Sequence, residues 1–169
     1  LEDLNLDGAD SHAIGWRDEI PAAARAAAHV VVIGCGEAGL LAGIRLREAG
    51  IPFTIVEKNA GPGGTWYDNR YPGARVDVGS HFYCYSFEPS DHWSEYFCQH
   101  DELQQYFVHV MQKYGVEPNI RFETECTGAA YDDTTGRWKV SVRAKDGTTD
   151  VLDAVAVISA VGSLNIPLI

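Results

Sequence analysis

Three glycines, Gly34, Gly36 and Gly39, follow a run of four β-branched residues and precede a helical pattern. This spacing suits phosphate binding. The first glycine allows a tight turn, the second lets the backbone approach a pyrophosphate, and the third lets the helix pack closely on the strand. Free N–H groups at the start of the helix attract the phosphate even in an acidic protein. Residues 34–39, the glycine turn, are therefore predicted to bind a dinucleotide.

An acidic residue, Glu57, lies 18 residues beyond Gly39, at the end of the next predicted strand. At that place a carboxylate can accept hydrogen bonds from both ribose hydroxyls of an adenosine, and it would repel a 2′-phosphate. The expected ligand is therefore FAD or NAD rather than NADP. The structural alternative is a solvated acid at a strand end.

Residues 61–97, the aromatic segment, contain ten of the eighteen aromatic residues and little periodicity. A long irregular segment of this kind is usually functional. Gly63 and Gly64 permit close backbone approach, and Trp66 and Tyr71 offer flat surfaces to a ring system. A simple NAD site has no evident use for such a segment, so these residues favour FAD.

The glycine turn must be positioned by a strand before it and a helix after it. The continuous apolar run Val30–Ile33 predicts a strand buried on both faces. Glu37–Ala49 alternates apolar and charged residues as a helix does, and Gly50 and Pro52 supply a stop signal. Phe53–Val56 predicts a second strand, which completes a right-handed βαβ unit.

A second helix and further strands follow the aromatic segment. Asp101 and Gln104 resemble a capping box at the start of the helix, and Gly115 ends it. The remaining strand candidates, joined by turn sequences, are Gly128–Tyr131, Trp138–Ala144 and Val151–Ala160. Within the last of them, Ala154–Ile158 is expected to be a buried parallel strand.

Charge and cysteine content exclude several classes of function. Thirteen Lys and Arg against 24 Asp and Glu give a net charge of −11, which opposes binding to nucleic acid or to an anionic membrane. The sequence shows neither a signal peptide nor a transmembrane span. Four cysteines without a Cys-x-x-Cys pair favour neither a metal site nor disulfides, so we expect packing thiols in a reducing cytoplasm.

Two motifs identify a family. The run Gly-Gly-Thr-Trp-Tyr-Asp-Asn-Arg-Tyr-Pro-Gly-Ala-Arg-Val-Asp at 63–77, with Tyr-Cys-Tyr-Ser-Phe at 83–87, resembles the FAD-binding domain of Baeyer–Villiger monooxygenases. The extra sequence before the first strand resembles the 4-hydroxyacetophenone monooxygenase branch. The resemblance implies an α/β, Rossmann-like FAD-binding domain with a central parallel sheet and an added β-meander, incomplete here. Residues 1–28 would be an N-terminal extension or linker, and 29–169 the N-terminal portion of a longer enzyme.

The resemblance also implies roles for individual residues. The cofactor-binding set is Gly34, Gly36, Glu37, Gly39, Glu57, Lys58, Gly64, Thr65, Trp66, Asp77, Tyr83, Cys126 and Gly162. Thr65 and Trp66 would lie beside the flavin, Tyr83 would bound its pocket, and the backbone around Cys126 would meet the adenine. Asp77, the catalytic candidate, would lie near both flavin and nicotinamide.

Several of these residues could instead have purely structural roles. Trp66 and Tyr83 could be core aromatics, and Asp77 could cap a loop. Residues Ser159-Ala160-Val161-Gly162 resemble the Ala-Thr-Gly motif that approaches FAD in two-dinucleotide flavoproteins. Because Val161 replaces the usual polar residue, Gly162 is the more credible FAD contact.

The implied activity is oxidation of ketones to esters or lactones, with NADPH as co-substrate and O2 as oxidant. The family's second G-x-G-x-x-G and its Phe-x-Gly-x-x-x-His-x-x-x-Trp fingerprint do not occur in these 169 residues, so we expect a fragment that is inactive alone. The alternatives are an N- or S-oxygenating flavin monooxygenase, another FAD oxidoreductase, or a non-catalytic dinucleotide-binding module. Neither the ketone nor the oligomeric state can be predicted.

Overall fold

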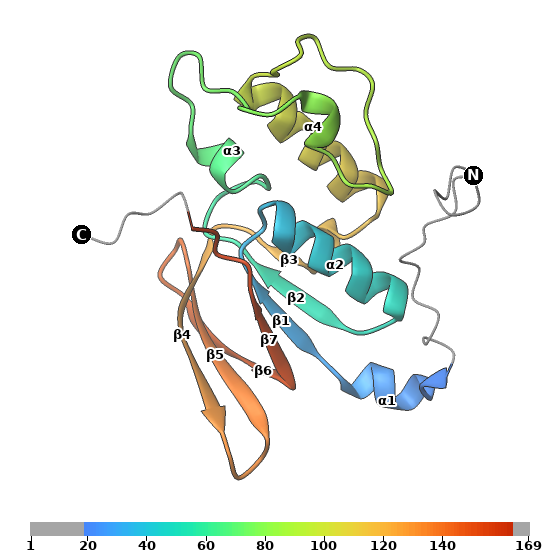
Figure 1. Cartoon of the computed structure of the whole chain (residues 1–169). Helices are drawn as coiled ribbons and strands as arrows, with labels where there is room; N and C mark the ends of the chain where they lie inside the picture. Colours follow the sequence, from blue (N-terminus) through green and yellow to red (C-terminus); the bar gives the residue numbers. More distant parts are fainter. Residues whose placement is uncertain (1–18, 164–169) are drawn as a thin grey trace.

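The computed structural model describes residues 19–163 (Figure 1). Its centre is a four-stranded parallel sheet in the order β3-β2-β1-β7. The strands are β1 (Val30–Ile33), β2 (Phe53–Val56), β3 (Ile120–Arg121) and β7 (Ala156–Ser159). Helix α2 (Glu37–Ala49) connects β1 to β2, so the predicted βαβ unit is confirmed.

Strand β1 is buried on both faces because its side chains alternate between two cores. Val30 and Val32 pack with Leu40 and Ile44 of α2. Val31, which is fully buried, packs on the opposite side of the sheet. A strand with a covered layer on each face requires an apolar residue at every position, which is why an uninterrupted β-branched run forms it.

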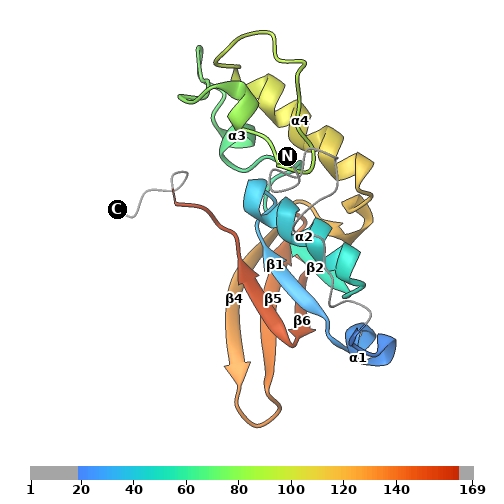
Figure 2. The same ribbon diagram turned by 45° about the vertical axis from the view of Figure 1, so that its right-hand side comes forward.

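The second covering layer is an antiparallel meander of β4 (Thr124–Asp132), β5 (Arg137–Ala144) and β6 (Thr149–Ala154). Val140 and Leu152 of the meander pack against Val31 of the sheet. Figures 1 and 2 show the meander on one side of the parallel sheet and α2 on the other. The predicted α/β fold with an added meander is confirmed.

One strand prediction is wrong. The range 151–160 forms two strands in different sheets, because the chain bends at Val155, whose N–H donates to the carbonyl of His29 at 2.9 Å. The second of them, β7, is parallel to β1 as expected, but it is an edge strand with Ile158 37% exposed rather than buried. Pattern alone could not place the bend, because both halves are apolar.

The aromatic segment is irregular, as predicted, apart from α3 (Thr65–Asp68) and the 3-10 turn η3 (Ser80–Phe82). It crosses above the sheet in Figure 1 and lies along α4 (His100–Lys113). A further 3-10 turn, η4 (Glu117–Asn119), leads into β3.

The expected capping box of α4 is wrong. The helix begins at His100 with Gln99 as its N-cap, so Asp101 already lies in the first turn. The side chain of Gln104 instead donates to the carbonyl of Pro62 at 3.3 Å, which ties the helix to the aromatic segment. Its predicted end at Gly115 is confirmed by a left-handed φ of 62° at that residue.

Of the expected N-terminal extension, 1–28, the structure describes only the last part, where α1 (Ala22–Ala27) forms a short helix. Residues 1–18 lie outside the described range. None of the helices in the described part of the chain combines the length and apolarity that a bilayer crossing requires.

Candidate functional site

The glycine turn needs glycine at two positions for steric reasons. Gly34 has a φ of 99°, and a Cβ there would lie 2.6 Å from the carbonyl oxygen of Ala160. A Cβ on Gly39 would lie 1.9 Å from the carbonyl oxygen of Gly34. These are backbone atoms that cannot move aside, so both glycines set the close packing of turn, helix and neighbouring strand.

Gly36 has a different role, because the position where its Cβ would lie faces a second segment that contains glycine, at Gly63 and Gly64. A Cβ on Gly36 would lie 3.5 Å from Cα of Gly64, which has a left-handed φ of 54°. The N–H of Gly63 donates to the carbonyl of Cys35 at 2.9 Å and holds the two segments together. Backbone alone lines this junction, and added side chains would fill it. The sequence-predicted residues Gly36 and Gly64 therefore lie together.

Glu57 is buried, with 4% exposure, and its carboxylate lies against the same turn. One oxygen accepts the N–H of Cys35 at 2.7 Å, and the other accepts the N–H of Asn59 at 2.8 Å. Each carboxylate oxygen can accept a second hydrogen bond, so a polyol hydroxyl can still bind. The neighbouring Lys58 is exposed, and its Nζ lies 3.8 Å from a carboxylate oxygen of Asp68 in α3.

The thiol of Cys35 is not a nucleophile. The residue is fully buried, and burial, reinforced by the negative charge of Glu57, raises the pKa of the thiol to about 12. A thiol that stays protonated at neutral pH is a packing group. Among residues 19–163, no cluster of three or more His, Cys, Asp or Glu side chains could hold a metal ion.

A pair of aromatic residues lies in the aromatic segment beside the turn. Trp66, the second residue of α3 after Thr65, donates its indole N–H to the hydroxyl of Tyr83 at 3.1 Å, with the rings edge to face at 5.4 Å. Burial raises the pKa of Tyr83, and the charges of Glu37 and exposed Asp77 raise it further, against the Trp66 hydrogen bond. Four predicted site residues, Trp66, Tyr83, Glu37 and Asp77, therefore lie near one another.

The two remaining predicted residues lie farther along the chain. Gly162 is exposed with a φ of 72°, directly after a stretch in which Ala160 and Val161 face Gly34. Cys126 is partly buried on β4. The start of that strand reaches Glu57, because the N–H of Thr124 donates to the Glu57 carbonyl at 2.9 Å.

Sequence reasoning missed Tyr85 and Tyr106. The Tyr85 hydroxyl donates to the carbonyl of Glu37, the first residue of α2, at 2.6 Å. The hydroxyl of Tyr106, from α4, accepts the N–H of Tyr85 at 2.9 Å. The signals in the sequence were the density of aromatic residues and, for Tyr85, the motif at 83–87, and neither says which hydroxyl reaches which carbonyl.

Comparisons with known proteins match this geometry. The family model for an NAD(P)-binding Rossmann-like domain matches residues 32–99. A Baeyer–Villiger monooxygenase of Streptomyces coelicolor is 40% identical over 139 residues, which are 82% of this chain and 26% of that protein. This chain is a homologue of Baeyer–Villiger monooxygenases.

Solved structures of this homologous group have the same fold. A steroid monooxygenase bound to NADP is 40% identical, with a TM-score of 0.72 over 80% of this chain and 26% of that one. Cyclohexanone monooxygenase from Rhodococcus sp. Phi1, bound to NADP+, is 35% identical, with a TM-score of 0.74 over 83% of this chain and 27% of that one. The chain thus spans about a quarter of the length of these three relatives.

Proposed function

We propose that residues 29–169 form the FAD-binding portion of an NADPH- and O2-dependent Baeyer–Villiger monooxygenase that converts ketones to esters or lactones. The junction of Gly36 and Gly64, lined by backbone alone beside a helix N-terminus, is the observation that carries the proposal. The homology to monooxygenases of this type supports the same reaction.

The described residues fit FAD. The glycine turn would hold the pyrophosphate, because bare backbone and free N–H groups suit an anion, and a side chain on Gly36 would occupy the space that the anion needs. Glu57, with Lys58 beside it, would bind the adenosine ribose, and its negative charge disfavours a 2′-phosphate at this turn. NADPH would then bind elsewhere as the co-substrate.

The flavin end would lie with Thr65, Trp66, Asp77 and Tyr83. The hydrogen bond to Tyr83 fixes the indole plane of Trp66, and burial moves the pKa of Tyr83 further above neutral pH. Asp77 would keep a carboxylate near the nicotinamide. When bound, the flavin supplies hydride acceptance and activation of O2, while the protein orients it and excludes water.

Two further contacts complete the proposed cofactor site. The backbone around Cys126, on the strand that begins beside Glu57, would meet the adenine edge. Gly162 would let the backbone approach FAD, because it has no side chain and, its two chain neighbours aside, none of the other residues in 19–163 has an atom within 4 Å of its Cβ position.

Product analysis tests the reaction. The full-length protein that carries this chain is incubated with NADPH, O2 and a cyclic ketone, an aryl ketone, an amine or a sulfide. Ester or lactone formation coupled to NADPH consumption is the expected result. Oxygenation of the amine and sulfide with no ester would contradict the Baeyer–Villiger assignment, and FAD binding with no turnover would indicate a non-catalytic module. Preference for 4-hydroxyacetophenone over cyclohexanone would support the narrower branch assignment.

A further inference from the structure

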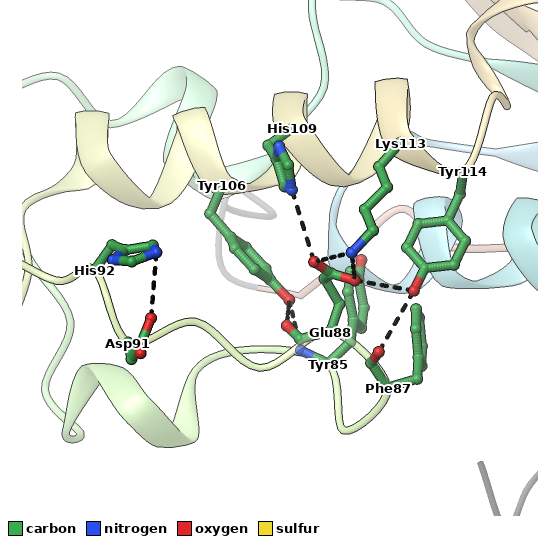
Figure 3. A network of polar contacts seen from close by, with 9 residues as sticks. All are labelled: Tyr85, Phe87, Glu88, Asp91, His92, Tyr106, His109, Lys113 and Tyr114. Carbon is green, nitrogen blue, oxygen red and sulfur yellow. Dashed lines mark hydrogen bonds and ion pairs between the residues drawn. The ribbon is translucent and has the colours of Figure 1, made fainter. Parts of the chain in front are cut away.

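The carboxylate of Glu88 is held by donors from a single helix (Figure 3). Nζ of Lys113 lies 2.7 Å from both carboxylate oxygens, and the hydroxyl of Tyr114 donates at 3.0 Å. His109 approaches one oxygen to 3.6 Å. The Glu88 side chain is only 13% exposed, whereas that of Lys113 is 51% exposed, so the carboxylate is shielded from water while the ammonium group stays partly open to it.

The backbone of the same turn is also attached to α4. The N–H of Glu88 donates to the carbonyl of Tyr85 at 2.9 Å and closes a tight turn. The hydroxyl of Tyr106 donates to the Glu88 carbonyl at 2.7 Å and accepts the N–H of Tyr85 at 2.9 Å. Figure 3 shows Glu88 facing the row of α4 side chains with Tyr85 directly behind it.

Tyr85 extends the connection to the glycine turn. It is 6% exposed, its ring stacks on Phe87 at 5.1 Å, and its hydroxyl donates to the Glu37 carbonyl at 2.6 Å. Glu37 follows Gly36 directly and begins α2. An unbroken series of contacts therefore runs from Lys113, through Glu88 and Tyr85, to the helix start where the phosphate would bind.

We propose that Glu88 is a positioning residue for the cofactor site. Its carboxylate fixes the turn at residues 85–88 to α4, and this fixed turn holds the Tyr85 hydroxyl on the first turn of α2. The identity of the ligand, FAD, rests on the proposed function, whereas the contacts do not. A carboxylate is favoured because both of its oxygens accept from Nζ of Lys113, whereas an amide would lose the charge attraction and would place an NH2 donor against that cation.

A matched pair of substitutions tests the proposal by fluorescence titration with FAD. Glu88→Gln removes the charge, and Glu95→Gln makes the same change in the same segment, where Glu95 pairs with Arg75 at 3.0 Å with both side chains over 40% exposed. We expect Glu88→Gln to raise the FAD dissociation constant about tenfold. Glu95→Gln should change it by less than about twofold.

A second variant separates positioning from general loosening of the fold. Tyr85→Phe deletes the hydroxyl that reaches Glu37 and leaves the bonds of the Glu88 carboxylate in place. Because the two residues act in series, the double variant should bind FAD about as weakly as the weaker single variant. If the fold-change in the FAD dissociation constant of the double variant instead equals the product of the two single fold-changes, Glu88 acts through the fold in general and the proposal is overturned.

Hydrogen exchange supplies a readout that does not require FAD. Glu88→Gln should speed amide exchange at residues 37–41, the start of α2, but not at residues 45–49 at its end. If wild-type protein binds FAD and both Gln variants bind it equally well, the positioning role is overturned. If wild-type protein binds no FAD, the proposed function fails, and the exchange at residues 37–41 alone decides the role of Glu88: faster exchange supports it and unchanged exchange overturns it.

Discussion

The glycine turn can form because its glycines have no side chains. The aromatic segment, in contrast, is held in place by contacts between side chains that are far apart in the sequence. Gly39 lies so close to Gly34 that no Cβ fits. Tyr85, in contrast, is placed by a hydroxyl bond to a residue 48 positions earlier. The first kind of region is damaged most by adding atoms, and the second by removing them.

The largest expected effect is that of adding one methyl group to the turn. Gly39→Ala would place a Cβ 1.9 Å from a backbone oxygen, so unfolding free energy should fall by about 3 kcal/mol or more. Gly43→Ala in the same helix is the matched comparison and should cost less, because its Cβ would meet side-chain atoms, the tip of Ile55 at 2.7 Å and the ring of Phe53 at 3.1 Å, rather than backbone. Denaturant titration measures both, and equal stabilities would show that the turn is not sterically limited.

Removing a charge beside the turn should have the next largest effect. Glu57→Gln leaves one acceptor oxygen where two backbone N–H groups, those of Cys35 and Asn59, now donate to a carboxylate. The amide NH2 would face a donor, so stability should fall by about 2 kcal/mol, and FAD binding should weaken as well. Unchanged stability and FAD affinity would remove Glu57 from the site.

The smallest expected effect is the pH dependence of the stability that Glu88 contributes to the aromatic segment. Burial tends to raise the pKa of Glu88, but hydrogen bonds from Lys113 and Tyr114, with the charges of Lys113 and His109, outweigh it and lower the pKa. Arg45 and Glu48 of α2 also lie near this cluster, because Arg45 stacks on Phe87 and both influence Tyr114.

Because the folded pKa of Glu88 is depressed, its stabilisation is full above the ordinary Glu pKa of about 4.3 and is lost as pH falls through the lower folded value. The difference in stability between wild type and Glu88→Gln, on the order of 1 kcal/mol, should therefore be present at neutral pH and vanish in acid. Unfolding curves from pH 7 to about pH 3 measure it. A difference that grows in acid would contradict the assigned contacts.

Elements specified by local signals could be predicted from the sequence, and features specified by contacts between distant residues could not. Strand β1, helix α2 and strand β2 begin and end at the predicted residues, because apolar runs, a stop glycine and a glycine turn are local signals. The division between β6 and β7 was missed, because one bond from Val155 to His29 decides it. The role of Glu88 was likewise invisible, since its partners lie 25 and 26 residues away.

The central claim is tested most directly by titrating apo-protein with FAD and comparing wild type with Gly36→Ala. The added Cβ would make only an ordinary 3.5 Å contact with Gly64, so the fold should persist while the junction of Gly36 and Gly64 is filled. We expect wild type to bind FAD with a dissociation constant on the order of micromolar or tighter and the variant to bind roughly tenfold or more weakly at equal stability. Equal FAD affinity of the two proteins, or no FAD binding by wild type, would contradict the account.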